Sequence, residues 1–384
     1  MQFEFSTATR IIFGRGKLNE IGQIAKEMGR KVLVVSGNSH QRHAQLSSIL
    51  DDIGIQSLFY AVSGEPTVDG VRAGNAISRQ EGCDLVIGIG GGSVIDTAKA
   101  IAVLSTNDGD VLDYLEVIGR GKKLTQPGLP MIAIPTTAGT GSEVTRNSVI
   151  GDPGHKIKVS LRSPFLLPAI ALIDPDLTIS VPPEITANTG MDTLTQLIEP
   201  FVGNKANPLT DIICEEGLKY ASQSLITVYQ DGKDVQSRVN MALASLFSGF
   251  ALANAQLGAV HGFAGVLGGM YSAPHGGLCA CLLPSVLKVN ILALQKRKPT
   301  SLTLPRYERI AQILTGNSDS TALDTVEFVE MLNREFHILP LSQYGVRMDE
   351  FPEIVVKSAG SSSMKGNPVD LTPDELYSIL EMAL

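Results

Sequence analysis

Hydrophobic positions in the first 180 or so residues alternate between two patterns. Short runs rich in β-branched residues are almost continuously apolar, which predicts strands buried on both faces of a sheet. The segments between them carry apolar residues at helical spacing. Strands are predicted over residues 31–36, 83–88, 131–134 and 169–173, and helices over 18–28, 68–81 and 93–104. This alternation predicts a Rossmann-like α/β domain with a parallel, doubly wound sheet over residues 1–181.

The pattern changes after Asp174-Pro175. Residues 180–183, Ser-Val-Pro-Pro, interrupt the chain, and the segments that follow are long and helical, with few β-branched runs. Helices are predicted over residues 185–201, 209–225, 235–256 and 277–294. We therefore expect a second, all-α domain over residues 182–384.

The composition agrees with two well-packed domains and argues against one class of binding partner, nucleic acid. A chain of 384 residues is long for one domain, and 43% apolar against 18% charged residues provides large buried cores. The net charge of -8 and the absence of tryptophan argue against a nucleic-acid partner, which normally meets a concentrated basic face. A small-molecule partner is expected instead.

Neither a membrane span nor an export signal is expected from the sequence. No stretch reaches about 18 uninterrupted apolar residues, and residues 1–14 lack a basic segment followed by an apolar run. The four cysteines form no CxxC pair and no zinc-finger spacing, so we interpret them as buried thiols. They are Cys83, Cys214, Cys279 and Cys281. The expected location is the reducing cytoplasm.

A glycine-rich turn joins a predicted strand to a predicted helix. Gly90, Gly91, Gly92 and Ser93 directly follow the strand residues Leu85 to Ile89. Glycines let backbone amides approach a pyrophosphate, and the start of a helix adds unpaired N–H groups. The turn therefore predicts an anionic nucleotide cofactor. The alternative is a purely structural turn, with Ser93 as helix cap and Asp96 as capping-box acid.

A second turn, residues 135–143, follows the strand at 131–134 and is rich in small hydroxylated residues. It includes Thr136, Thr137 and Ser142. A parallel sheet places its ligand crevice outside the carboxyl ends of its strands, so these hydroxyls and the nearby amides are candidates to hold phosphate or ribose. Such residues are also ordinary loop formers, which is the structural alternative.

Three ionisable residues of the helical half stand in apolar surroundings. Asp192 lies near a predicted helix start, where an unpaired buried carboxylate would be costly and a cation partner is expected. His261 and His275 lie in apolar, glycine-rich stretches. One carboxylate and two imidazoles suit a divalent ion that keeps a position open for substrate. Alternatively, each histidine is a satisfied core residue.

Four motifs together resemble the signatures of the iron-containing, or group III, alcohol dehydrogenase family. They occur in the family's order and at similar separations, between about Thr9 and the segment 366–368. They are the segments 90–96, 135–143, 190–192 and 274–276. The resemblance implies a cofactor on the amino-terminal half, a metal on the helical half, chemistry in the cleft between them, and a homodimer. It also implies that an alcohol and an aldehyde or ketone are interconverted by hydride transfer with NAD(P).

The resemblance places the family's metal ligands on Asp192, His261 and His275, with Fe²⁺ or Zn²⁺ as the ion. The remaining family histidine falls on Gln196, four residues after the aspartate. An amide oxygen is a weaker ligand than imidazole for iron or zinc. The related glycerol dehydrogenases and dehydroquinate synthases use one acid and two histidines, which keeps a three-ligand site credible. Where many relatives have a proton-relaying histidine, this chain has Gly265. Proton release must then use water, a cofactor hydroxyl or another group.

The resemblance also indicates which residues contact the cofactor. NAD-preferring relatives often place an acidic residue after the first strand, whereas this chain has Gly37-Asn38-Ser39. Without that carboxylate a 2′-phosphate meets no repulsion, so we predict that NADP(H) is accepted. Lys158 matches a family lysine near the nicotinamide, or is a surface strand charge. The full candidate set is Gly37, Asn38, Gly90, Gly91, Gly92, Ser93, Asp96, Thr136, Thr137, Ser142 and Lys158.

The expected mechanism has the metal bind the substrate oxygen as a Lewis acid while hydride passes between nicotinamide and substrate carbon. Three alternatives stay open at this point. The first is a maleylacetate reductase-like enzyme that reduces an unsaturated oxo acid. The second is a dehydroquinate synthase-like lyase that uses NAD catalytically. The third is a nucleotide-binding protein without catalysis.

Overall fold

The computed structural model describes residues 2–38, 40–155, 157–271 and 273–384. It divides into two compact units. The α/β unit comprises Thr7–Thr137 and Gly141–Ile179, and the helical unit comprises Ser180–Leu384, the segment that ends at Ser6, and Ala138–Thr140. Within the helical unit, the Gly139 carbonyl accepts a hydrogen bond from Thr193 Oγ1 at 3.1 Å. The middle of the hydroxyl-rich turn therefore packs with the helices.

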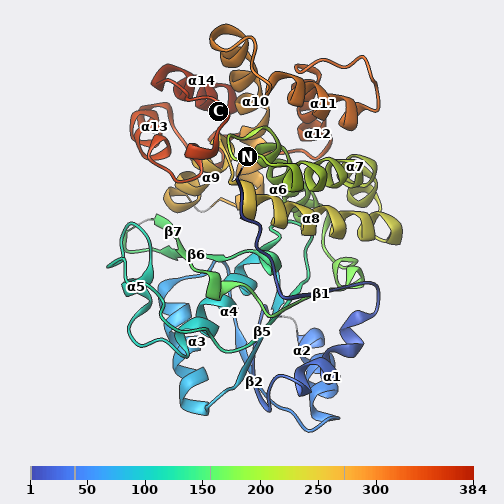
Figure 1. The fold of residues 1–384 in the computed structure, drawn as a ribbon, viewed down its shortest axis with the longest axis vertical. Helices are drawn as coiled ribbons and strands as arrows, with labels where there is room; N and C mark the ends of the chain where they lie inside the picture. The colour runs from blue at the N-terminus through green and yellow to red at the C-terminus, as the bar shows by residue number, and fades with distance from the viewer. Residues whose placement is uncertain (1, 39, 156, 272) are drawn as a thin grey trace. The chain divides into compact units, whose positions relative to one another are not determined.

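A six-stranded sheet forms the centre of the α/β unit (Figure 1), and every pairing in it is parallel. The strand order is β1 (Arg10–Phe13), β8 (Ile170–Ile173), β5 (Met131–Pro135), β4 (Leu85–Gly90), β2 (Lys31–Ser36) and β3 (Gln56–Ala61). The predicted fold class is confirmed. The apolar pattern did not predict β1 and β3, because these edge strands are partly exposed and lack a continuous apolar run.

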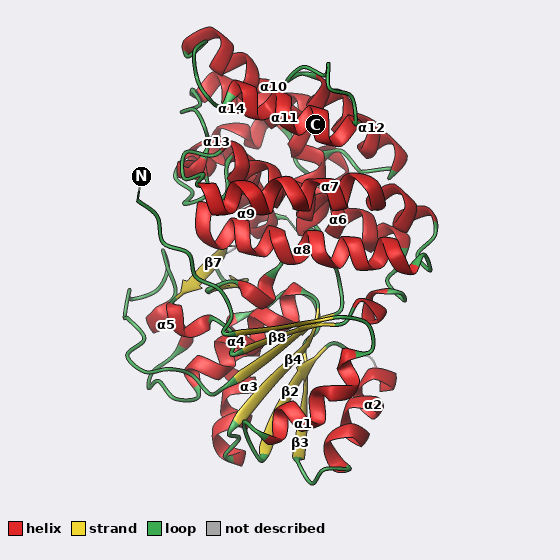
Figure 2. Ribbon diagram, turned by 45° about the vertical axis from the view of Figure 1, so that its right-hand side comes forward, coloured by secondary structure: helices red, strands yellow, loops and turns green. Residues whose placement is uncertain are grey.

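Successive residues of the central strands face opposite sides of the sheet, as the alternation of side chains in a strand requires. Val32 and Val34 pack with α1 (Ile21–Lys26) and α2 (His40–Asp51), whereas Leu33 and Val35 pack with α4 (Gly92–Leu104). Figure 2 shows α1 and α2 on one side of the strands and α3 (Val68–Glu81) on the other. The sheet is thus covered on both faces, which explains its continuous apolar runs.

A smaller antiparallel sheet, β6 (Asn147–Asp152) and β7 (Ile157–Arg162), completes the α/β unit. It was not predicted, since its strands alternate buried and partly exposed positions. Ile150 and Val159 pack against α3 and α4 through Val71 and Val103. Short 3-10 helices lie at Lys17–Glu20, Ser142–Val144, Pro164–Leu166 and Pro175–Thr178.

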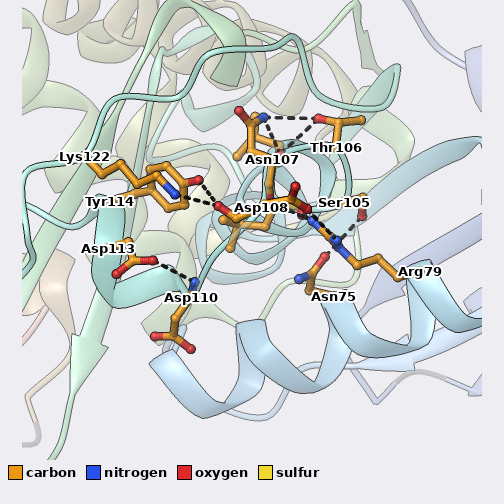
Figure 3. Close-up of polar contacts among 12 residues, drawn as sticks. Asn75, Arg79, Ser105, Thr106, Asn107, Asp108, Asp110, Asp113, Tyr114 and Lys122 are labelled. Atoms are coloured by element: carbon orange, nitrogen blue, oxygen red, sulfur yellow. Dashed lines mark hydrogen bonds and ion pairs between the residues drawn. The ribbon is translucent and has the colours of Figure 1, made fainter.

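A network of polar contacts connects the carboxyl end of α4 with the short helix α5 (Val111–Tyr114) (Figure 3). Arg79 Nη2 donates to the carbonyls of Leu104 and Asn107, both at 2.6 Å. A cation at this position stabilises the helix, because the carboxyl end of a helix carries the negative end of its dipole. Tyr114 Oη donates to the Asp108 carbonyl at 2.5 Å. This end of α4 is therefore fixed by its own loop, while its amino end belongs to the candidate cofactor site.

The helical unit is built around one hydrophobic core that includes Met191, Leu218 and Leu282. Its helices are α6 (Pro183–Val202), α7 (Pro208–Gln230), α8 (Val235–Ala255), α9 (Ala259–Met270), α10 (His275–Arg297), α11 (Leu304–Thr315), α12 (Asp324–Glu335), α13 (Phe351–Ala359) and α14 (Pro373–Ala383). Its 3-10 helices are Leu341–Tyr344, Met348–Glu350 and Met364–Gly366. The sequence did not predict α9, because this buried helix has no polar face and its glycines lower helix propensity.

By length and composition alone, α10 is apolar enough to cross a membrane, and the bent pair α8 and α9 passes the same test together. In α10, 83% of the apolar stretch is buried inside the structure. A core helix has this burial, so the composition of α10 is weak evidence for a membrane span.

Candidate active site

The three predicted metal ligands come together inside the helical unit. Asp192 lies on α6, His261 on α9 and His275 at the first residue of α10. Asp192 Oδ1 is 3.3 Å from His261 Nε2 and 3.8 Å from His275 Nε2. The side chains of Asp192 and His261 are buried, whereas that of His275 is 35% exposed. The cluster is therefore reached from solvent on the His275 side.

A fourth donor, Cys279, joins this cluster, and sequence reasoning missed it. Its Sγ lies 3.8 Å from His261 Nε2 and 3.7 Å from His275 Nε2, and the four donor atoms all lie within 4.8 Å of one another. The prediction of buried thiols is confirmed, since all four cysteines are buried and free. The available signal was spacing, because Cys279 follows His275 by four residues and so shares its helix face.

Glu199 of α6 orients His261, and the sequence analysis did not single it out. Its Oε2 lies 2.7 Å from His261 Nδ1, and its Oε1 accepts a hydrogen bond from the Val260 amide at 2.7 Å. With Nδ1 engaged by this carboxylate, Nε2 is the nitrogen that faces the cluster. A carboxylate behind a ligating imidazole is the common outer partner of metal-binding histidines. The signal was again spacing, since Glu199 lies two helical turns after Asp192.

The amino end of α9 reaches Glu199 because the preceding residue is glycine. A Cβ on Gly258 would stand 2.9 Å from Glu199 Oε1 and 3.2 Å from Asn367 Oδ1. Asn367 Oδ1 in turn accepts from the Ala259 amide at 3.3 Å. A negative charge at the start of a helix is favourable, so the same carboxylate stabilises α9 and aligns His261.

Gln196 supports Asp192 from the next turn of α6. Its Oε1 accepts a hydrogen bond from Ser248 Oγ at 3.0 Å, and its side chain hydrogen bonds to Asp192. The amide oxygen is thus used by a hydroxyl of α8. Ligation of a metal by Gln196 stays a prediction, while its contacts explain how the aspartate is positioned. Gly265 faces open space on α9, where a Cβ would meet nothing within 4 Å.

The charges of the cluster fit a bound cation. Burial alone would raise the pKa of Asp192, but the neighbouring imidazoles of His261 and His275 bring that pKa below its ordinary value. The neighbouring Cys279 raises the pKa of His275 to about 9 against the effect of burial. Although burial lowers it, the pKa of His261 lies well above its ordinary value because of Cys279 and Glu199. The surroundings therefore favour positive charge at this point.

An unsatisfied atom supports the same conclusion. Asp192 Oδ1 is fully buried and has no hydrogen-bond partner among the described residues. Leaving a buried carboxylate oxygen unpaired is costly, and a metal ion at the centre of the cluster would satisfy it. Carboxylate, imidazole and thiolate are together a donor set for a first-row divalent metal such as zinc. The residues present fit a divalent ion.

In the α/β unit, the predicted nucleotide residues gather at the carboxyl ends of neighbouring strands. The strand pairs place the end of β4, Gly90, beside Pro135 of β5, and the Thr136 amide donates to the Gly90 carbonyl at 2.9 Å. Gly37 and Asn38 follow β2, which pairs with β4 on its other side; Ser39 lies outside the described residues. The chain order reverses between β2 and β4, which is where doubly wound sheets bind ligands.

The structural alternative for the glycine turn, in which Ser93 caps the helix, is wrong. Gly91, not Ser93, is the residue that caps α4, no side chain caps the helix, and Ser93 lies within its first turn. A Cβ on Gly91 would have only ordinary contact with Thr137, 3.4 Å from its Oγ1. The first N–H groups of a helix lack partners within it, so this uncapped end suits an anion.

Asp96 and Ser142 meet within the α/β unit around a buried lysine that sequence reasoning missed. Asp96 accepts from Ser142 Oγ at 2.5 Å and from the Val149 amide at 2.8 Å, so it does not act as a capping-box acid. Lys99 Nζ donates to Ser142 Oγ at 3.0 Å and to Thr145 Oγ1 at 2.7 Å. Burial lowers the pKa of Lys99 to about 8. These contacts hold the end of the hydroxyl-rich turn and the segment that follows it. Cofactor contacts of Asp96 and Ser142 stay predictions.

Lys158 lies on β7, where its ammonium group is 3.5 Å from Glu65 Oε1. Its side chain is only 14% exposed, so it is more enclosed than the surface charge of the structural alternative. Its role near the nicotinamide stays a prediction.

Comparison with known proteins decides the family. The model of the iron-containing alcohol dehydrogenases matches residues 8–175, and that of the carboxyl-terminal domain of the Fe-containing alcohol dehydrogenase family matches residues 186–384. The chain belongs to the iron-containing alcohol dehydrogenase family. The resemblance drawn from the motifs is confirmed.

Relatives of this iron-containing alcohol dehydrogenase match over nearly its full length. Alcohol dehydrogenase 4 of Saccharomyces cerevisiae strain YJM789 is 34% identical, covering 97% of this chain and 96% of the yeast protein. The NAD-dependent methanol dehydrogenase of Bacillus methanolicus is 31% identical, covering 97% of this chain and 97% of the bacterial protein. A solved 1,3-propanediol oxidoreductase superposes with a TM-score of 0.92 at 31% identity, covering 100% of both chains.

Family membership confirms the predicted activity class. The iron-containing alcohol dehydrogenases are oxidoreductases that interconvert small alcohols and carbonyl compounds with NAD(H) and a divalent metal. The roles of the individual residues described above in this chemistry stay predictions.

Proposed function

We propose that this chain interconverts a small alcohol and its aldehyde or ketone with a nicotinamide cofactor, assisted by a divalent ion at Asp192, His261 and His275. The observation that carries the proposal is the buried Asp192 Oδ1, which faces two imidazole nitrogens and has no hydrogen-bond partner among the described residues. A divalent ion held there supplies a Lewis acid that polarises an alcohol or carbonyl oxygen.

The protein's part in this chemistry is to orient the donors and to admit one small molecule. Glu199 fixes the tautomer of His261, and Gln196 supports Asp192. His275, the most exposed of these donors, leaves its side of the cluster accessible. Burial of the other donors excludes water, which strengthens their interactions with developing charge.

A substrate panel tests the proposal directly. Protein purified under reducing conditions is loaded with Zn²⁺ or Fe²⁺ and given short alcohols with NAD⁺ and the matching aldehydes with NADH. We expect turnover with alcohols and aldehydes, its loss on exhaustive chelation, and its return when metal is restored. Undiminished turnover in verified metal-free protein would overturn the metal-assisted mechanism. Reduction of maleylacetate without any aldehyde activity would overturn the proposed substrate class.

Replacing Glu199 with glutamine tests how His261 is aligned. The neutral amide cannot accept from both the Val260 amide and His261 Nδ1 as the carboxylate does. We expect metal affinity to fall by about 10- to 100-fold, as for other outer partners of ligating histidines. The change in metal affinity is measured as the metal content that remains after dialysis against increasing concentrations of chelator. Glu216→Gln on the exposed side of α7 is the matched control, and equal losses in both variants would contradict the assignment.

The substitution Gly91→Ala tests whether Gly91 is needed for cofactor binding or only for the fold. The backbone of Gly91 is extended and a Cβ there meets only ordinary contacts, so the variant should fold with unchanged stability. A methyl group at the uncapped start of α4 would push a pyrophosphate away from the amides. We expect NAD(H) affinity to fall by at least about 10-fold, or ~1.4 kcal/mol. Calorimetric titration measures it, and unchanged affinity in the folded variant would count against this phosphate site.

We further propose that NADP(H) is accepted beside NAD(H), because Gly37 and Asn38 place no carboxylate after β2. A Cβ on Gly37 meets nothing within 4 Å, so Gly37→Asp has space for its side chain. We expect the ratio of kcat/KM for NADPH to that for NADH to fall by about 10-fold through charge repulsion. Gln56→Glu adds the same charge on the exposed first residue of β3 and should leave the ratio unchanged. Equal ratios in Gly37→Asp and the parent protein would refute the proposal.

A further inference from the structure

We infer that the Cys279 thiolate is the fourth protein ligand of the metal, which makes the site an aspartate, two histidines and a cysteine. The inference rests on the proposed function, in which the same cluster holds the ion. It adds a soft sulfur donor that the sequence analysis did not assign. Two independent observations carry it: the position of the sulfur, and the buried Asp192 Oδ1, which faces the same centre and has no hydrogen-bond partner among the described residues.

The separations between donors fit one shared ion. Ligands at zinc–sulfur and zinc–nitrogen bond lengths, arranged tetrahedrally, stand roughly 3.6 Å apart, and oxygen and nitrogen ligands stand roughly 3.4 Å apart. Cys279 Sγ lies 3.8 Å from His261 Nε2 and 3.7 Å from His275 Nε2. Asp192 Oδ1 lies 3.3 Å from His261 Nε2 and 3.8 Å from His275 Nε2. Each measured distance is within a few tenths of an ångström of the tetrahedral value.

The environment of Cys279 differs from that of a structural thiol on the same helix. Cys281, two residues later, donates from its Sγ to the Ala383 carbonyl at 3.3 Å. The hydrogen-bond partners of Cys279 Sγ within the described residues are the two imidazole nitrogens of the cluster. Cys279 is fully buried, so its sulfur meets the metal centre and not solvent.

Cys279 suits this position better than Gln196, whose amide oxygen accepts from Ser248 Oγ at 3.0 Å and is a weaker ligand than thiolate for zinc. A sulfur ligand also changes the preferred ion. Thiolate is soft and suits zinc, whereas a site of oxygen and imidazole donors accepts iron more readily. Four protein ligands leave room for substrate only as a fifth, a coordination number that zinc reaches during catalysis.

Binding through Cys279 has a defined proton balance. The S–H bond breaks, a sulfur–metal bond forms, and the proton passes to solvent, with no change in oxidation state. Both imidazoles bind through neutral Nε2, so any proton that they carry before binding is released too. Asp192 and Cys279 together then neutralise the charge of the divalent ion.

The test loads the full-length protein with Co²⁺ as a spectroscopic probe and compares the parent chain with Cys279→Ala and the matched control Cys281→Ala. We expect a thiolate-to-cobalt charge-transfer band in the near ultraviolet for the parent and Cys281→Ala, and no such band for Cys279→Ala. We also expect Cys279→Ala to bind Co²⁺ and Zn²⁺ at least about 10-fold more weakly in chelator competition.

X-ray absorption on the zinc-loaded parent protein decides the question even if the alanine variant does not fold. A zinc–sulfur distance of about 2.3 Å supports the inference. A parent protein that binds metal with only nitrogen and oxygen neighbours and no thiolate band would overturn it, while the proposed function would stand. A parent protein that binds neither cobalt nor zinc would overturn both. Cys279→Ala with parental affinity and an intact band would also overturn the cysteine ligand.

Discussion

Replacing His261 and His275 together with alanine is expected to remove bound metal and to lower kcat/KM by at least about 10³-fold. The two imidazoles supply two of the four donor atoms in the cluster. Without them, a divalent ion would be left with one carboxylate and one sulfur. Metal analysis of the purified variant and steady-state kinetics on the alcohol panel measure the two effects.

Two controls separate loss of the site from loss of the fold. The change at His261 leaves Glu199 buried without its imidazole partner, at a cost of about 1–3 kcal/mol in stability. Thermal unfolding of the variant shows whether that cost is tolerated. His155→Ala removes an exposed histidine from the α/β unit and should leave metal content and turnover unchanged. NAD(H) affinity should be retained in the double variant, and full activity there would end the metal mechanism.

Gly276→Ala is expected to have the second largest effect, because it acts on the packing that forms the cluster. A Cβ on Gly276 would stand 2.2 Å from the carbonyl oxygen of Asn188 and 2.6 Å from its carbonyl carbon. These are backbone atoms of α6 and cannot rotate away, so α10 must shift. The shift would carry His275 and Cys279 away from Asp192. We expect a loss of about 1–3 kcal/mol in stability and loss of high-affinity metal binding.

Gly265→Ala is the matched control for this prediction. It adds the same methyl group on the neighbouring helix α9, where a Cβ meets nothing within 4 Å. Alanine within a helix is favoured over glycine by about 0.5–1 kcal/mol, so this variant should be slightly more stable and should keep its metal. Chemical denaturation and metal titration of both variants check the pair. A Gly276→Ala protein that binds metal as tightly as the parent would show that close contact between α6 and α10 is unnecessary.

The sequence by itself was sufficient for the fold class and for three of the four donors in the cluster. Continuous apolar runs are typical of strands that are covered on both faces. The central strands β2, β4 and β5 were therefore predicted close to their observed limits. A carboxylate or imidazole in an apolar stretch also carries its own signal, because such a group is costly to bury without a partner. Asp192 and His261 were recognisable for that reason.

Only the tertiary structure revealed helix α9, the position of Cys279 and the pairing of Glu199 with His261, because these features depend on contacts between segments that are remote in sequence. Helix α9 has no polar face to give periodicity and is stabilised by the core that surrounds it. A buried cysteine looks the same in sequence whether it meets leucine or a metal centre, so the role of Cys279 depended on which side chains α6 and α9 bring to it. The pairing of Glu199 with His261 has the same origin. Local pattern determines which residues are buried, whereas packing between helices determines which buried groups meet.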